Sequence, residues 1–246
     1  MSVQTDAKRK EGGFAETVRV VFHALIIALV IRTFLFQPFN TPSGAMAPTL
    51  LVGDYFVANK FAYGFSRFTL PFRPWGFSGR FFARDPQVGD VVVFVQPKDP
   101  SVTYVKRVIG LGGDHIRMRE GLLYVNGSPI ERERLSDVVG DFCGTSSFVT
   151  VKRWRETLPN GASYETLDCV DNGFYDNTPE YVVPAGYAFV MGDNRDNSTD
   201  SRVLSAMGYI PLDNIYGRAS MIFYSREVGQ HGESVVRSER IGTLVR

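Results

Sequence analysis

The longest apolar run in the chain lies close to its N-terminus. From residue 18 to residue 36 the sequence consists mostly of Val, Leu, Ile, Ala and Phe, close to the ~20 residues that a membrane-spanning helix needs. Arg19 and Arg32 lie near its two ends, where long basic side chains can reach the headgroup regions. The pattern predicts a single transmembrane anchor over residues 14–37.

The flanks of this run indicate how it is used. A cleavable signal peptide is the alternative, but residues 32–37 (RTFLFQ) offer no small-x-small cleavage site, so we expect the anchor to be retained. Basic residues cluster at 8–10. The excess of positive charge on the cytoplasmic side of membrane proteins predicts a cytoplasmic tail over residues 1–13. Residues after 37 are then expected on the outer face.

After the anchor the apolar pattern is that of short strands. Strands are predicted at 53–58, 89–95, 104–109, 122–125, 187–191, 215–218 and 221–224. Asn126 and Gly127 form the dipeptide most favourable to a tight hairpin turn. No long amphipathic helix is predicted after residue 40, and strands do not alternate with helices, so the outer part is predicted to be mostly antiparallel β.

Between residues 61 and 84 aromatic side chains alternate with arginines. They are Phe61, Tyr63, Phe65, Phe68, Phe72, Trp75, Phe77, Phe81 and Phe82, with Arg67, Arg73, Arg80 and Arg84. Aromatic residues favour the membrane interface and arginines favour anionic headgroups. One hypothesis is that this segment dips into the outer leaflet beside the anchor. The other is a small hydrophobic core inside the β domain, and the sequence leaves both open.

Charge and cysteine content exclude several classes of function. The 27 Lys and Arg residues nearly balance 26 Asp and Glu residues, so nothing indicates a nucleic-acid partner. No Cys/His cluster or metal-ligand spacing occurs. The three histidines have no convincing Ser or Cys partner, which disfavours a Ser-His-Asp triad. Cys143 and Cys169 are the only cysteines, and they are either disulfide-bonded or two free buried thiols.

A stiff loop follows directly after the anchor. Pro42 and Pro48 fix their own φ angles and favour extended conformations in the residues before them, while Gly44 permits unusual ones. The pattern predicts a rigid, extended loop that presents the small side chains of Ser43 and Ala45. Such a loop beside an anchor suggests action on something held in the same membrane.

One lysine lies inside a predicted strand. Alternation places Lys106 on the same face as Tyr104 and Val108, which are largely apolar. A buried lysine with a lowered pKa can act as a general base. The alternative is a lysine that reaches solvent at the edge of the sheet, and the local pattern favours that simpler interpretation.

Three motifs occur in a fixed order after the anchor. They are residues 42–50 (PSGAMAPTL), residues 104–110 (YVKRVIG) followed by Gly113 and Asp114, and residues 191–202 (MGDNRDNSTDSR). Together they closely resemble the motifs of bacterial type I signal peptidase, and residues 237–242 (RSERIG) are similar to the C-terminus of that family. The resemblance extends over essentially the whole chain.

The resemblance implies a mostly β fold shared with self-cleaving repressors. The catalytic β domain would comprise residues 38–121 and 182–246, with an inserted β-rich cap over residues 122–181. The implied activity is removal of N-terminal signal peptides from secreted preproteins by a Ser–Lys dyad, without metal or cofactor. The enzyme would be a single-pass protein of the bacterial inner membrane. Its partners would be preproteins with N-terminal signal peptides and membrane lipid.

The resemblance also assigns roles to residues. Lys106 would be the base, and Ser43 would donate to the oxyanion together with the backbone N–H of residue 45. Ser198 would orient the lysine, Asp200 and Arg202 would form a supporting ion pair, and Gly192 and Asn197 would shape the site. Substrate pockets would be lined by Phe39, Thr41, Pro42, Met46, Leu50, Tyr104 and Val105, with Thr41 more polar than the aliphatic residue expected there.

One position departs from the family pattern. The family has PSGSM where this chain has PSGAM, so Ala45 stands at the position of the nucleophilic serine. A methyl group cannot attack a carbonyl, and this chain is therefore expected to bind a preprotein without cutting it. Either the protein is a natural non-cleaving pseudoprotease that binds signal peptides, or a serine has been replaced by alanine. Because Lys106 and Ser198 are retained, we favour replacement in an active protease.

Overall fold

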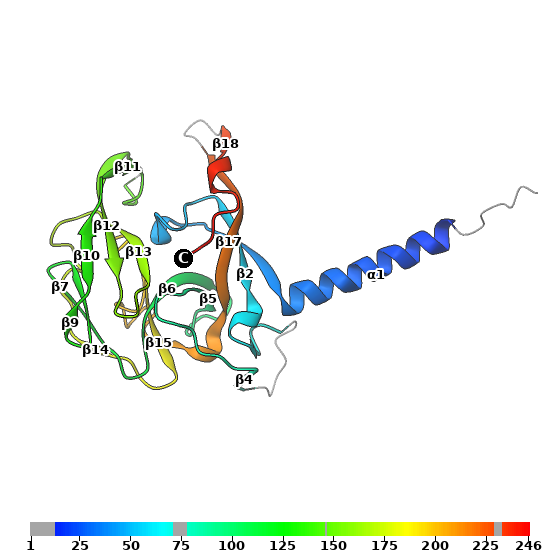
Figure 1. Ribbon diagram of the computed structural model, residues 1–246, viewed down its shortest axis with the longest axis horizontal. Coiled ribbons are helices and arrows are strands. Elements are labelled where there is room, and N and C mark those ends of the chain that lie inside the picture. Colours follow the sequence, from blue (N-terminus) through cyan, green and yellow to red (C-terminus); the bar gives the residue numbers. More distant parts are fainter. Residues whose placement is uncertain (1–12, 71–77, 146, 229–232) are drawn as a thin grey trace, which may run out of the picture.

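The computed structural model describes residues 13–70, 78–145, 147–228 and 233–246, and it consists of one helix projecting from a β body (Figure 1). The helix α1 (Gly13–Phe34) is long and apolar enough to cross a membrane by length and composition. It ends at Phe34, so the last residues of the predicted anchor already belong to the β body. The basic cluster at 8–10 lies outside the described residues.

The main sheet of the body contains eight strands, and every pairing in it is antiparallel. In spatial order they are β1 (Phe36–Asn40), β2 (Asp54–Asn59), β17 (Ile215–Val228), β5 (Val91–Val95), β6 (Thr103–Leu111), β15 (Tyr187–Met191) and β16 (Ile210–Pro211), with β18 (Ser234–Val236) paired to β17. β1 follows α1 almost immediately and pairs at the edge with β2, so the helix leads directly into the sheet.

Two strands predicted separately form one. The runs at 215–218 and 221–224 both belong to β17, which continues to Val228. Its pairing with β2 shifts between Ala219 and Met221 and again between Ile222 and Tyr224. Such irregularities interrupt the alternation of side chains between the two faces, which is why the sequence pattern suggested a break.

The other half of the body carries two smaller antiparallel sheets. One has the order β14 (Tyr181–Val182), β7 (His115–Arg119), β8 (Leu122–Val125) and β9 (Ser128–Pro129). The other contains β10 (Glu131–Arg134), β12 (Val149–Thr157), β11 (Val138–Gly140) and β13 (Ser163–Asp168). The predicted turn between β8 and β9 is confirmed, since Asn126 and Gly127 both have positive φ, 52° and 80°.

The two halves share a core. One buried cluster joins Ile109 of β6 and Phe189 of β15 to Ile116 of β7, Leu123 of β8 and Tyr164 of β13. β7 pairs with both β8 and β14, so one sheet continues across the predicted cap boundaries at 122 and 181. Contacts of this kind hold the cap and the main sheet in a fixed arrangement.

The described aromatic residues between 61 and 82 fall into a buried group and an exposed group. Tyr63, Phe65 and Phe68 are buried, whereas Phe61, Phe81 and Phe82 are exposed. Phe65 lies in the short strand β3 (Phe65–Ser66), which pairs with β4 (Arg80–Phe81), and its ring contacts that of Phe34 at the end of α1, 5.6 Å between centroids. The exposed rings therefore lie beside the base of the helix. The predicted aromatics Phe72, Trp75 and Phe77, with Arg73, lie outside the described residues.

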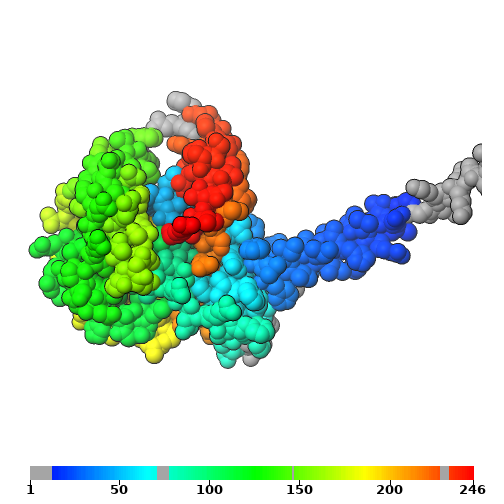
Figure 2. All heavy atoms as spheres, viewed as in Figure 1, coloured from blue at the N-terminus to red at the C-terminus, as the bar shows by residue number. Residues whose placement is uncertain are grey.

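The C-terminal segment lies on the main sheet next to the cap (Figure 2). Arg237, and Arg240 of the 3-10 turn η4 (Ser238–Arg240), both pair with Asp54 at the start of β2, whose side chain is fully buried. Arg240 also donates to the Thr49 carbonyl, 3.0 Å away. The end of the chain is thus fastened to the segment that follows Ala45.

Candidate active site

Ala45 lies in the 3-10 turn η1 (Gly44–Met46) between β1 and β2. The predicted extended conformation extends only through Ser43, with φ −132° and ψ 157°, after which the chain turns. Asn194 holds this turn by two hydrogen bonds. Its backbone N–H donates to the Ala45 carbonyl and its side-chain amide donates to the Gly44 carbonyl, both at 3.1 Å.

Lys106 is buried in the centre of the main sheet, on β6 opposite Val92 of β5. Only 3% of it is exposed. Burial lowers the pKa of Lys106 to about 8, although the charges of Asp200 and Asp193 oppose this shift. No hydrogen bond or ion pair joins its ammonium to any residue in the described ranges. Of the two interpretations left open by the sequence, the desolvated lysine is confirmed.

A carboxylate network lies next to the lysine. Asp200 is fully buried and pairs with Arg202 through both of its oxygens at 2.9 Å. Although burial opposes its ionisation, Arg202 and the backbone N–H of Gly192, 3.0 Å away, hold the pKa of Asp200 below its usual range. The expected ion pair is therefore present, and its negative oxygen favours the charged form of Lys106.

Ser198 also belongs to this network. Its hydroxyl donates to Asp200 over 2.8 Å, so in this structure its proton is directed at the carboxylate. Its oxygen remains able to accept a hydrogen bond from the lysine. The orienting role suggested for Ser198 rests on that acceptor and stays a prediction.

Gly192 allows the network and the loop to approach one another. A Cβ at this position would lie 2.3 Å from Ser198 Oγ and 2.5 Å from the carbonyl oxygen of Ala45. Real Cβ atoms do not approach other atoms so closely, and only glycine fits here.

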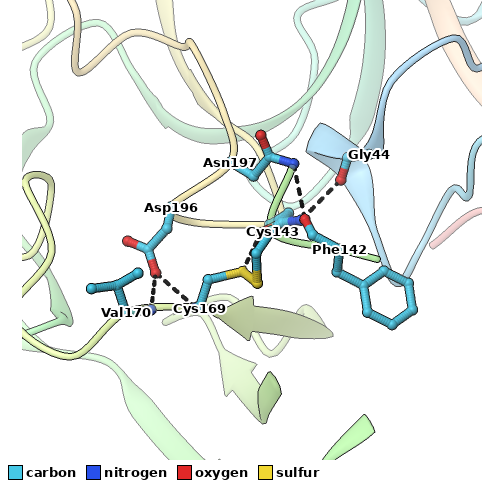
Figure 3. The surroundings of a disulfide bond; sticks show 8 residues. Gly44, Phe142, Cys143, Cys169, Val170, Asp196 and Asn197 are labelled. Atoms are coloured by element: carbon cyan, nitrogen blue, oxygen red, sulfur yellow. Dashed lines mark hydrogen bonds between the residues drawn. A yellow bond between two sulfur atoms is a disulfide. The ribbon is translucent and has the colours of Figure 1, made fainter. Parts of the chain in front are cut away.

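The cap reaches the site at Phe142, next to a disulfide that joins two of its segments (Figure 3). Cys143 and Cys169 are bonded, which settles the alternative left open by the sequence. The carbonyl of Phe142, next to Cys143, accepts hydrogen bonds from the side-chain amides of Asn194 and Asn197, at 2.6 and 2.9 Å. Asn197, which lines a pocket at the site, is thus hydrogen-bonded to the cap, and its role in shaping the site stays a prediction.

An apolar pocket of about 250 Å³ opens on one side of residue 45. Six of the predicted substrate-binding residues line it, namely Phe39, Thr41, Pro42, Met46, Tyr104 and Val105. Phe56, Val93 and Val102 complete its apolar wall. Leu50 does not line it: the structure places this residue in the core cluster below the loop, fully buried.

A second, more polar pocket of about 340 Å³ lies on the other side. It shares Ser43, Ala45, Tyr104 and Lys106 with the apolar pocket. Its other walls are Tyr175 of the cap and the segment 196–199. Residue 45 and Lys106 therefore lie in the middle of one continuous groove. Neither the Ser43 hydroxyl nor the Ala45 N–H donates a hydrogen bond within the described part of the chain.

The opposite face of β6 carries a buried ion pair that no sequence motif indicated. Arg107 binds Asp193 through two nitrogens at 2.7 and 2.6 Å, and the same carboxylate accepts the Thr49 hydroxyl at 2.5 Å. The guanidinium also lies 4.1 Å from the centre of the Tyr164 ring in the cap. Alternation places Arg107 on the same strand face as Val105 and Ile109, and an arginine on such an apolar face was a signal that a buried carboxylate would be needed as its partner. Among the described residues no group of His, Cys, Asp and Glu could hold a metal ion.

Comparison with known proteins agrees with this geometry. The family model described as signal peptidase, peptidase S26, matches residues 14–224. The signal peptidase I of Rickettsia typhi is 40% identical over 212 residues, covering 83% of this chain and 78% of that protein. The chain belongs to the signal peptidase I family. The Rickettsia conorii member is 38% identical over 230 residues, covering 90% of this chain and 81% of its own length.

Among solved structures, a signal peptidase I from Enterococcus faecalis is 24% identical and covers 55% of this chain and 97% of that one, with a TM-score of 0.32. The signal peptidase I match begins within α1. An apolar helix at the N-terminus and membership of this family together support a membrane-anchored enzyme.

Proposed function

We propose that this chain is a disabled form of a membrane-bound serine endopeptidase that removes N-terminal signal peptides from secreted preproteins. The observation that carries the proposal is the buried Lys106, whose pKa is lowered to about 8 and which opens onto the same groove as residue 45. A lysine of this kind is neutral often enough near pH 8 to remove a proton from a serine hydroxyl.

The proposed reaction needs a serine at position 45. Neutral Lys106 takes the proton from that hydroxyl while its oxygen attacks the carbonyl carbon of the scissile peptide bond. The leaving amine takes a proton from the lysinium as the peptide bond breaks, and the acyl-enzyme forms. Lys106 then deprotonates a water molecule, whose oxygen attacks the ester carbonyl. The lysinium returns this proton to the serine oxygen as the ester bond breaks, and the other product leaves with a free carboxylate.

The negative oxygen formed in both steps requires donors. The Ser43 hydroxyl and the N–H of residue 45 line the groove and have no partners in the described structure, so they are free for this role. We assign them to the oxyanion hole. The polypeptide substrate would lie extended beside the strands near residues 41–45 and 104–106. Its small residue before the cleaved bond would fill the apolar pocket.

The membrane is the second partner in this proposal. The exposed rings of Phe61, Phe81 and Phe82 lie beside the base of α1, where they would enter the outer leaflet. The N-terminus would be cytoplasmic and the β body would face the outer side of the bacterial inner membrane. Lipid contact at these rings would bring the groove close to substrates that are anchored in the same bilayer.

Ala45 accounts for the disabled state. The surrounding machinery is intact, because Lys106 is desolvated and the pair of Asp200 and Arg202 is formed. Catalytic side chains that have lost their purpose are not expected to stay in place, so we propose that alanine was introduced for serine. The alternative is a receptor that binds signal peptides without cleavage, which the open groove around Ala45 also allows.

Cleavage of a preprotein by the chain and by its Ala45→Ser version, in detergent or liposomes, tests the proposal. We expect cleavage after a small-x-small sequence only in the serine version, with kcat/KM rising with pH around 8 as Lys106 loses its proton. Lys106→Met in the serine background is the matched control, and it should bind preprotein without turning it over. Absence of cleavage by the serine version, with binding retained, would favour the receptor.

A further inference from the structure

A single carbonyl oxygen of the cap supports both asparagines at the site. Phe142 lies between β11 and β12, far in sequence from its partners. Its carbonyl accepts a hydrogen bond from the amide of Asn197 (Figure 3) and a second one from the amide of Asn194. Hydrogen bonds between such distant segments are made only if the cap holds this carbonyl in place.

Asn194 passes this support to the catalytic turn. It is fully buried, and its side-chain nitrogen uses its two hydrogens for the carbonyls of Phe142 and Gly44. Its backbone N–H donates to the Ala45 carbonyl. The peptide group between residues 44 and 45 is planar, with its C=O and N–H pointing in opposite directions. Fixing the Gly44 oxygen therefore fixes the direction of the N–H of residue 45.

The disulfide holds the Phe142 carbonyl in position. Cys143 follows Phe142 directly and is bonded to Cys169 at the end of β13. The backbone N–H groups of Cys169 and Val170 both donate to Asp196, at 2.8 and 3.0 Å, which lies in the same loop as the two asparagines. The neighbouring residues Asp141 and Gly144 are exposed, so this part of the cap is held by the disulfide together with the packing of Phe142 and Cys143 against the cluster of Ala47 and Leu167.

We infer that Asn194 is a positioning residue for the oxyanion-binding N–H of residue 45. The Cys143–Cys169 disulfide keeps the Phe142 carbonyl, and through it the Asn194 side chain, in the required position. The inference rests on the proposed function for its effect on the rate. It predicts that the enzyme works fully only when the cap disulfide is formed.

Activity is tested in the Ala45→Ser enzyme with Asn194→Ala and with Cys143→Ser/Cys169→Ser. Removal of one oxyanion donor lowers kcat by about 10²–10³. Misdirection of a donor that is still present should have a smaller effect, which we place at about 10- to 100-fold for Asn194→Ala and at about 10-fold for the cysteine variant. KM should change less than about 2-fold, because the groove walls are untouched. Glu133→Ala, which breaks an exposed ion pair with Arg155 between β10 and β12, away from the disulfide, is the control and should leave kcat unchanged.

A reductant compares the same enzyme with and without its cap disulfide, with no substitution. Dithiothreitol should lower kcat of the Ala45→Ser enzyme reversibly and should not affect the cysteine variant. All rates are measured well below the melting temperature of each variant. An unchanged kcat in Asn194→Ala, or a fall that follows thermal stability alone, would overturn the inference.

A second readout does not depend on turnover. In the chain with Ala45, hydrogen exchange of residues 44–50 reports the turn directly, since the Ala47 N–H is bonded to the Gly44 carbonyl at 3.1 Å. We expect faster exchange in Asn194→Ala and after reduction. Unchanged exchange would refute the inference even if the serine enzyme is active. Faster exchange together with an inactive Ala45→Ser enzyme would support the positioning of the turn by Asn194 and reject the proposed function.

Discussion

Replacing Lys106 by methionine should make the protein more stable at neutral pH. The lysine is buried at a position where its charge is poorly solvated, and this lowers its pKa from 10.5 to about 8. The difference of about 2.5 in pKa corresponds to about 3 kcal/mol, at 1.36 kcal/mol for each factor of ten. Methionine is similar in length, carries no charge and adapts well to a core site.

The penalty depends on pH in a defined way. Below about pH 8 the lysine is protonated in both folded and unfolded protein, and the folded state bears the whole penalty. Between about 8 and 10.5 the folded protein releases its proton first, so stability contributed by this residue rises with pH. Above 10.5 the amine is neutral in both states and the penalty is gone.

Thermal and urea unfolding of the Ala45 chain and its Lys106→Met variant, in detergent, measure this effect. Allowing about 1 kcal/mol for imperfect packing, the variant should gain about 2 kcal/mol at pH 7, a rise of about 4–8 °C in Tm for a chain of this size. The gain should shrink towards zero near pH 10.5. Other groups that titrate in this range, including Lys60, whose pKa is also lowered to about 8, cancel in the comparison. No gain at pH 7, or a gain independent of pH, would refute the reasoning.

Three further changes test other parts of the structure. Gly192→Ala should lower the free energy of unfolding by about 1–3 kcal/mol, because the added methyl overlaps two oxygen atoms. A urea midpoint equal to that of the chain with Gly192 would contradict this. Arg240→Ala leaves the buried Asp54 with a weaker partner and should cost about 2–3 kcal/mol, seen as a lower Tm. Serine at both Phe81 and Phe82 should weaken liposome binding of a version starting at residue 37, and equal binding would exclude membrane contact by these rings.

The sequence predicted those parts of the fold that depend on local patterns. The apolar run became α1, and the runs at 187–191 and 122–125 became β15 and β8 with the same limits. The turn at Asn126 and Gly127 followed because it needs two residues tolerant of positive φ. β17 was divided in two because its irregular pairing with β2 disturbs the alternation that such predictions use.

The candidate site shows where local reasoning ends. Alternation placed Lys106 on an apolar face but did not decide whether it reached solvent, since that depends on the strands and the loop 196–200 packed around it. The motif resemblance predicted that Asp200 and Ser198 lie near the lysine. It also assigned Leu50 to the substrate pocket, whereas the structure places this residue in the core. Phe142 contributes its backbone carbonyl to the site. Every residue has such a carbonyl, so no sequence pattern could indicate this role.

The strand β1 has a consequence for where the groove can act. It starts two residues after α1 ends, and residues 41–43 then lead from its end to the turn that contains Ala45. Even if fully extended, residues 36–43 span only about 27 Å, so the groove stays close to the end of α1. A polypeptide anchored in the same bilayer meets it at a high effective concentration. Under the proposed function, a folded protein in bulk solution that carries the same small residues would first have to diffuse into this thin layer. Confinement near the bilayer would then add selectivity that shallow pockets alone would lack.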